Sequence, residues 1–178
     1  MTQEEVISRY GELQARVDEK FAEIHARYPA AFRCREGCHS CCKPNLTVNR
    51  LEAASIALFL RDRPELIASL RELAAANPFR AKRCSFLNAA GACGIYEARP
   101  LVCRSHGAPI QFKEGGGEDA MRLRDVCGLN FTGLDIGALP ADAVFNLDTL
   151  NTLLALLSSQ AYGKDVSRVP LSLNGILP

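Results

Sequence analysis

The sequence predicts a mainly α-helical fold with small β-hairpins, in which irregular cysteine-rich loops close around a metal centre. In four separate segments apolar residues recur every three or four positions, the spacing of one helix face. Eight cysteines lie largely in shorter segments that also carry glycine and proline, which favour turns. With 178 residues, 48% of them hydrophobic, the chain is long and apolar enough to bury a core.

The first predicted helix covers residues 3–28 and ends before Pro29. Charged residues fill many of the positions between its apolar ones, which are Val6, Tyr10, Leu13, Val17, Phe21, Ile24 and Tyr28. Such a stripe suits a coiled-coil seam with a partner. Packing on the chain's own core is the simpler interpretation, and we favour it.

Two shorter helices are expected next, separated by a proline. Asn49 and Glu52 have the spacing of a capping box at the start of the first one. Pro64 suits the first turn of the following helix, which ends before Pro78.

Two hairpins and one helical turn are expected in the middle of the chain. Residues 84–96 contain two short apolar runs around a turn, and residues 110–123 contain three consecutive glycines. Pro100 would lead a tight turn or a single helical turn over 98–104. The glycines are not framed by a strand and a helix as in a phosphate-binding loop, so we interpret them as a mobile loop.

A last helix is predicted over residues 140–162, followed by an irregular tail at 163–178. The chain then has three parts. These are an N-terminal amphipathic helix at 1–30, a cysteine-rich metal-binding core at 31–130, and a C-terminal helix and tail at 131–178 that pack on the core.

The bulk composition disfavours several classes of partner. The formal net charge is +1, so no strong field attracts nucleic acid. The acidic start lacks the basic and apolar regions of a secretory signal. The longest apolar run near the C-terminus, residues 153–157, is too short to span a bilayer. We therefore expect a cytoplasmic protein with no membrane or nucleic-acid partner, while a protein partner stays open.

A metal is the best explanation for the eight cysteines. A reducing cytoplasm disfavours disulfides, and a chain of this length folds without them. Tetrahedral zinc and cubane iron–sulfur clusters both take four thiolates, so eight serve two centres or one centre with spares. The candidate ligands are Cys34, Cys38, Cys41, Cys42, Cys84, Cys93, Cys103 and Cys127.

The densest cysteine group runs from Cys34 to Cys42 and places four thiols in a loop that costs little entropy to close. Cys41 and Cys42 are adjacent, and adjacent side chains diverge. The pair favours a centre with more than one metal atom, or one ligand beside a supporting neighbour. Radical S-adenosylmethionine enzymes share part of this spacing. The preceding helix, the missing βα repeats and Ser40 in an aromatic position argue against that class.

Histidines and arginines near the thiols are further candidates. His39 lies within the first cysteine group and His106 follows Cys103. Imidazole binds zinc and iron, but we favour a solvated or hydrogen-bonded role for both. The arginines around the cysteines are Arg33, Arg35, Arg83, Arg99 and Arg104. Guanidinium groups offset thiolate charge, and Arg99 and Arg104 are the predicted cofactor contacts. A phosphate-bearing ligand would use the same side chains.

Three stretches together resemble the YkgJ-type cysteine-cluster family of zinc- or iron-chelating proteins. The stretches are the group at 34–42 with the helix that carries Glu52, the run from Cys84 to Tyr96, and Arg99-Pro-x-x-Cys-Arg104 with Cys127 behind it. The family usually has two residues between its first cysteines, and this chain has three. The resemblance implies metal chelation, with an iron–sulfur centre in some members. Some longer relatives resemble flagellin lysine methylases.

We therefore predict a metal-binding protein that holds zinc or an iron–sulfur cluster through cysteine thiolates and serves electron transfer or metal handling. One alternative is a metal-dependent enzyme, an oxidoreductase or a modification enzyme. Its incompletely ligated metal would lie beside Arg99, Arg104 and His106. Another alternative is a structural zinc module that docks a partner through its first or last helix. The sequence identifies no catalytic residue.

Overall fold

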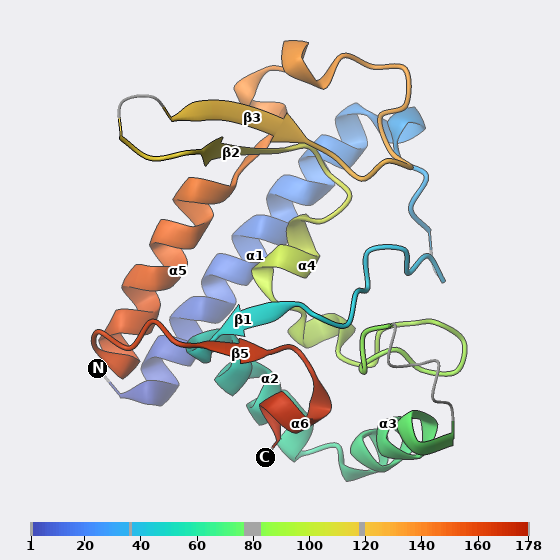
Figure 1. The fold of residues 1–178 in the computed structure, drawn as a ribbon, viewed down its shortest axis with the longest axis vertical. Helices are drawn as coiled ribbons and strands as arrows, with labels where there is room; N and C mark the ends of the chain where they lie inside the picture. The colour runs from blue at the N-terminus through green and yellow to red at the C-terminus, as the bar shows by residue number, and fades with distance from the viewer. Residues whose placement is uncertain (1, 36, 77–82, 118–119, 178) are drawn as a thin grey trace. The chain divides into compact units, whose positions relative to one another are not determined.

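The computed structural model describes residues 2–35, 37–76, 83–117 and 120–177 (Figure 1). It is mainly α-helical with small sheets of two and three strands, which confirms the predicted fold class. The chain divides into two compact units. Unit 1 comprises Met1–Tyr10, Arg35–Pro100 and Leu157–Pro178, and unit 2 comprises Gly11–Cys34 and Leu101–Leu156. Each unit is described by itself below.

Helix α1 spans Gln3–Arg27, close to the predicted 3–28. Five members of its apolar stripe are buried, namely Val6, Tyr10, Leu13, Val17 and Ile24. Acidic Glu4 and Glu5 lie in its first turn and basic Arg27 in its last, an arrangement that the helix dipole favours. The stripe is therefore covered by the chain itself, as expected.

In unit 1, helix α2 (Arg50–Arg61) begins with the predicted capping box. Asn49 Oδ1 accepts a hydrogen bond from the Leu51 amide at 2.9 Å, and Glu52 Oε2 accepts one from the Asn49 amide at 2.9 Å. The buried Glu52 carboxylate also accepts from the Tyr10 hydroxyl at 3.4 Å. Helix α3 (Pro64–Ala76) follows and packs against α2.

The C-terminal tail of unit 1 is ordered, so the prediction of an irregular tail is wrong. Strand β5 (Arg168–Pro170) pairs antiparallel with β1 (Thr47–Asn49), and the two lie side by side in Figure 1. The short helix α6 (Leu173–Ile176) then packs on α2. Burial of Leu171, Leu173 and Ile176 supplies the stabilisation that the tail's own sequence pattern does not reveal.

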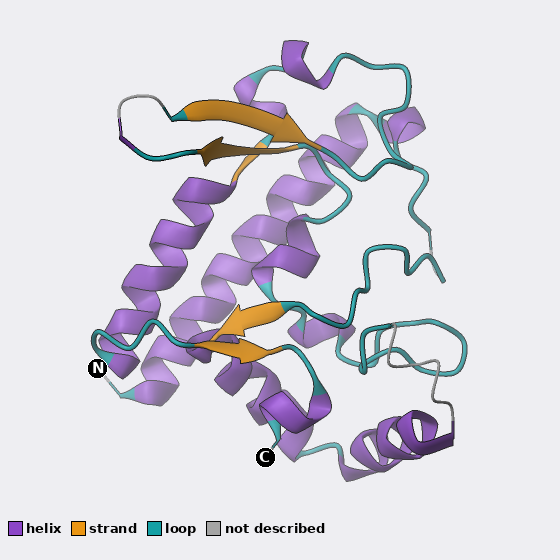
Figure 2. Cartoon of the chain, viewed as in Figure 1, coloured by secondary structure: helices purple, strands orange, loops and turns teal. Residues whose placement is uncertain are grey.

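The hairpin predicted at 84–96 forms only a single bridge, between Leu87 and Cys93, with turns on either side. Figure 2 accordingly draws this part of the chain mostly as loop. Asn88 Oδ1 accepts from the Ala92 amide at 2.9 Å, and the Gly94 amide donates to the Phe86 carbonyl at 2.8 Å. These local bonds satisfy the backbone, so the segment needs no longer ladder.

In unit 2, strands β2 (Ile110–Glu114) and β3 (Met121–Asp125) form the hairpin predicted at 110–123. The short strand β4 (Phe145–Asn146) adds to β2 in parallel. Of the tight turn or single helical turn predicted at 98–104, the helical turn forms, as the five-residue helix α4 (Leu101–Ser105).

Helix α5 spans Leu147–Tyr162 and therefore begins later than the predicted residue 140. The Phe145 amide donates to the Pro109 carbonyl at 2.9 Å, which holds the preceding residues in the sheet. Asn146 Oδ1 then accepts from the Thr149 amide at 3.1 Å, as a helix N-cap does. The sheet thus displaces the start of the helix.

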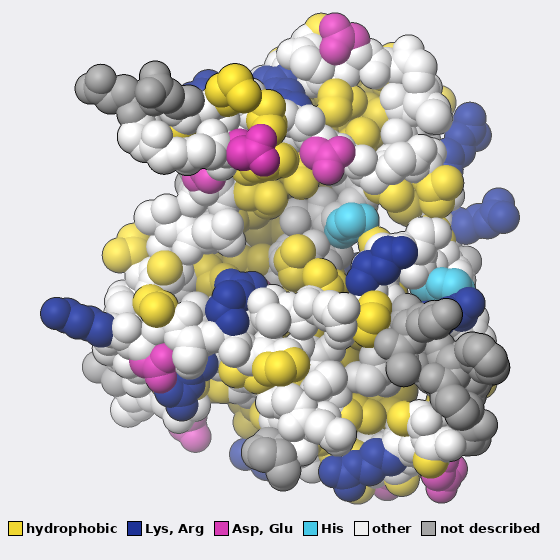
Figure 3. All heavy atoms as spheres, in the orientation of Figure 1, with side chains coloured by type: hydrophobic (Ala, Val, Ile, Leu, Met, Phe, Trp, Pro, Cys, Tyr) yellow, Lys and Arg dark blue, Asp and Glu magenta, His cyan; other side chains and the backbone are white. Residues whose placement is uncertain are grey.

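Basic and acidic side chains are interspersed over the face of the molecule shown in Figure 3. This agrees with the formal net charge of +1. Within the described ranges, no helix combines the length and the apolar character that crossing a membrane requires.

Candidate metal centre

The loop that carries Cys38, Cys41 and Cys42 in unit 1 is folded by short backbone hydrogen bonds. The Cys38 amide donates to the Arg35 carbonyl at 2.9 Å, and the Cys42 amide donates to the His39 carbonyl at 3.0 Å. The Cys42 carbonyl accepts from the Cys84 amide at 3.0 Å. Residues more than 40 positions apart are therefore tied together at their backbones.

In unit 1 the Cys41 side chain interacts with those of Cys42 and Cys93. A hydrogen bond with the Cys42 side chain, followed by burial, raises the pKa of the Cys41 thiol well above its usual range. Burial raises the pKa of the Cys93 thiol, and the negative charge that Cys41 would carry raises it further. The structure thus brings Cys93 within electrostatic reach of Cys41, and it favours the protonated form of both thiols in the metal-free protein.

Arg99 opposes these effects. Its guanidinium lowers the pKa of both Cys41 and Cys93, although by less than the other causes raise it. The side chain is held over the Tyr96 ring, with the guanidinium carbon 3.5 Å from the ring centroid. Its Nε donates to the Tyr96 carbonyl at 3.0 Å. Arg99 is therefore a fixed positive charge beside thiols that would become negative on binding a metal.

Cys38, Cys84 and His39 complete the candidate ligands in unit 1. Cys84 is buried and Cys38 is half-buried. The His39 ring packs against the loop between Cys84 and Cys93, where a Cβ added at Gly91 would lie 2.7 Å from His39 Cδ2. Gly91 also has a φ of 79°, so a side chain at this position would be strained as well as crowded.

Unit 2 holds the other three cysteines in a different setting. Cys34 is exposed, whereas Cys103 of α4 and Cys127 are half-buried. Burial lowers the pKa of His106, against the opposing charge of Asp125. None of the eight cysteines, all of which lie among the described residues, is in a disulfide.

Arg104 has a structural partner in unit 2. Its guanidinium is 7% exposed and forms an ion pair with Asp18 of α1. Loss of Asp18 would leave the buried Arg104 charge without this partner, so the ion pair supports the fold of unit 2. Arg99 and Arg104, the two predicted cofactor contacts, thus have different surroundings: Arg99 lowers the pKa of Cys41 and Cys93, and Arg104 pairs with Asp18.

Sequence reasoning missed Asn130, which lies in unit 2 and is 2% exposed. Its side-chain Nδ2 donates to Cys34 Sγ at 3.2 Å. The only sequence indication was a polar residue three positions after Cys127, which is too common a pattern to single it out.

Within the described part of the chain, no group of three or more histidine, cysteine or acidic side chains is already arranged to hold an ion. The chemistry of the donors nevertheless fits zinc or an iron–sulfur centre. Cys41 interacts with Cys42 and with Cys93, thiolate sulfur is a soft donor that suits either group, and Arg99 would offset the charge of Cys41 and Cys93.

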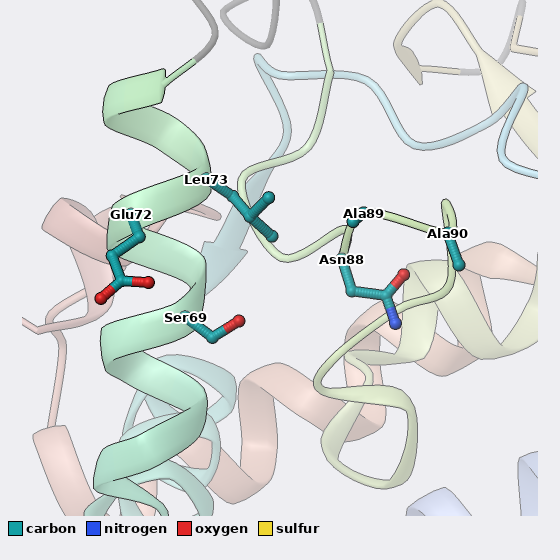
Figure 4. Close-up of a pocket in the computed structure, with 6 residues that line it drawn as sticks. All are labelled: Ser69, Glu72, Leu73, Asn88, Ala89 and Ala90. Atoms are coloured by element: carbon teal, nitrogen blue, oxygen red, sulfur yellow. The ribbon is translucent and has the colours of Figure 1, made fainter.

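A hollow of about 560 Å³ lies in unit 1 between α3 and the turn after Leu87 (Figure 4). Its lining consists of Ser69, Glu72, Leu73, Asn88, Ala89 and Ala90. This lining contains no sulfur, so the hollow does not coincide with the thiols.

The chain matches the CxxCxxCC family, described as a putative zinc- or iron-chelating domain, over residues 33–128. This match covers more than half of the chain, and the protein belongs to that family. The family membership confirms the predicted relationship and supports metal binding in general, without distinguishing zinc from iron. Neither a curated protein nor a solved structure matches the chain.

Proposed function

We propose that the protein binds zinc or an iron–sulfur cluster through thiolates drawn from its eight cysteines. The observation that supports this most strongly is that two cysteine segments of unit 1 lie together. The Cys84 amide donates to the Cys42 carbonyl at 3.0 Å, and the charge of Cys41 raises the pKa of Cys93. Thiols from distant segments beside a guanidinium are the donors that a bound zinc ion or cluster would need.

Unit 1 by itself carries enough cysteines for a complete site. Five of the eight lie there, and zinc and cubane clusters each take four thiolates. We infer that the ligands of unit 1 come from Cys38, Cys41, Cys42, Cys84 and Cys93. In unit 2 the candidate ligands are Cys34, Cys103 and Cys127.

Metal binding would reverse the electrostatic balance of these thiols. Burial and the Cys41–Cys42 hydrogen bond favour the protonated state in the metal-free protein. A bound cation displaces those protons, and Arg99 offsets part of the negative charge that remains. Zinc would supply a structural or transferable ion, which fits metal handling, whereas an iron–sulfur cluster would supply an electron carrier.

Anaerobic purification followed by elemental analysis and a visible spectrum tests the proposal. Iron and sulfide in equal amounts with broad visible absorption indicate a cluster, and stoichiometric zinc in a colourless protein indicates a zinc site. A protein that retains neither metal, and takes up neither on reconstitution, would overturn the proposal.

A further inference from the structure

The side chain of Asn130 forms hydrogen bonds with two segments of unit 2 that lie next to cysteines in the sequence. Its Oδ1 accepts from the amides of Arg33 at 2.8 Å and Cys34 at 3.3 Å. Its Nδ2 donates to the Gly107 carbonyl at 2.7 Å and to Cys34 Sγ at 3.2 Å. One buried amide thus uses both of its hydrogens and its oxygen on two separate segments.

The neighbours of this amide fix its orientation. Backbone amides only donate and a carbonyl only accepts, so Oδ1 must face residues 33 and 34 while Nδ2 must face Gly107. The nitrogen therefore has a hydrogen for Cys34 Sγ, and a thiolate there would accept a charge-assisted bond. The Cys34 Sγ–Asn130 Oδ1 distance is longer, at 3.5 Å.

The backbone around Asn130 connects this bond to the other candidate ligands of unit 2. The Asn130 amide donates to the Cys127 carbonyl at 2.8 Å. Gly107 directly follows His106, and α4 with Cys103 precedes it. Asn130 is therefore bonded to, or beside, the segments that carry all three cysteines of unit 2.

Two backbone features show that the geometry at this position is constrained. Phe131 has a φ of 54°, which is unusual for a bulky residue, and its amide donates to the Ala31 carbonyl at 2.8 Å. Gly107 has a φ of 102°, and a Cβ added there would lie 3.3 Å from Asn130 Nδ2 and 3.6 Å from Cys34 Sγ. The fold thus keeps the space between these groups free of a side chain.

We propose that Asn130 is a positioning residue that orients Cys34 for metal binding and donates a hydrogen bond to the Cys34 sulfur. The proposal rests on the proposed metal-binding function and extends it to a residue just outside the matched family region, 33–128. Hydrogen bonds to a metal ligand orient it and tune the affinity or reduction potential of the metal.

Substitution of Asn130 by aspartate removes the donated bonds and places a negative charge beside the Cys34 sulfur. N130D keeps the size of the side chain and an oxygen for the two backbone amides, but it loses both donor hydrogens. N146D is the matched control, because it makes the same chemical change in unit 2 at an exposed helix cap that accepts from the Thr149 amide. Circular dichroism melting checks that both variants fold.

Cobalt(II) titration of the metal-free protein provides the readout, because its absorption bands report thiolate coordination. We expect N130D to weaken binding about 10–100-fold and to alter the sulfur-to-metal bands, and N146D to match the wild-type protein. If the purified protein carries iron and sulfide, the same variants are compared by iron retention and midpoint potential. Equal affinity, spectrum and potential in folded N130D and the wild-type protein would overturn the inference.

A second variant tests the inference even if N130D fails to fold. Cys34 is exposed, so C34S should fold, and it must lower metal affinity at least about tenfold if Asn130 acts through this sulfur. In the C34S background, N130D should cause little further loss, as coupled residues do in a double-mutant cycle. Unchanged affinity in C34S would refute the inference. A wild-type protein that binds no metal would instead refute the proposed function.

Discussion

Cys93 in unit 1 and Cys34 in unit 2 are both candidate metal ligands, but their sulfur atoms have different surroundings. Cys93 is largely desolvated and lies near Cys41, and both effects raise its pKa. Cys34 is exposed and receives a hydrogen bond from the Asn130 amide. The positive charge of Arg99 acts on Cys93, whereas the neutral side-chain amide of Asn130 donates a hydrogen bond to Cys34.

The comparison shows two ways in which a fold can prepare a thiol for a metal. In unit 1, burial and neighbouring sulfur atoms raise the pKa of Cys41 and Cys93, so these thiols keep their protons until a metal cation displaces them. Unit 2 holds one sulfur against a preorganised donor that suits its ionised form. Variants that separate the two settings therefore test the proposed function most directly.

The largest effect is expected from removing a sulfur in unit 1. Structural zinc binding is worth about 10–16 kcal/mol, so one of four ligands carries about 3 kcal/mol. We expect C93S to weaken cobalt or zinc binding about 100-fold, measured by competition with a chelator. Binding by C93S at wild-type strength would show that the sulfur grouping of unit 1 is not the site.

Thiol reactivity in the metal-free protein should differ between the two units. A raised pKa leaves less thiolate at a given pH, and thiolate is the reactive form. At pH 8 we expect iodoacetamide to modify Cys34 at least about tenfold faster than Cys41 or Cys93. Site-resolved mass spectrometry after short exposures measures the rates. Equal modification rates at all three cysteines would show that the thiols of the two units do not differ in reactivity.

Arg99 should affect metal binding more than an otherwise similar arginine does. Arg63 also lies over an aromatic ring, 3.7 Å from the Phe59 centroid, but neither Cys41 nor Cys93 responds to its charge. We expect R99Q to weaken metal binding about tenfold because the thiolate charge loses its counterpart, and R63Q to have little effect. Similar losses in both variants would indicate a general effect of net charge.

The stability of the metal-free protein should decrease at alkaline pH. The folded chain holds the Cys41 and Cys93 protons more tightly than the unfolded chain, whose thiols have the ordinary pKa of 9.0. This stabilisation is complete below that pH and is lost as pH rises toward the higher folded-state values. We expect the melting temperature to fall about 2–4 °C between pH 8 and pH 10. The C41S/C93S variant should lack this part of the decrease.

Local sequence features predicted the helices well. The apolar stripe of α1, the capping box of α2 and the proline that begins α3 each act over a few residues, so they are readable without knowledge of the fold. Three short stretches together indicated the family for the same reason, since each of them is readable locally.

Contacts between distant segments were not predictable. The tail becomes ordered because β5 pairs with β1, whose residues lie about 120 positions earlier, and α5 starts late because β4 joins β2. A three-residue strand has too little sequence pattern to identify its partner.

The sequence by itself determined the helical framework, the metal-chelating family and the pool of thiols. Only the tertiary structure decided which thiols share a unit, that Cys93 approaches Cys41, and that Asn130 faces Cys34. The physical reason is that helix periodicity and capping are short-range along the chain. Desolvation, charge and hydrogen bonding at a thiol instead depend on whichever distant segments fold against it.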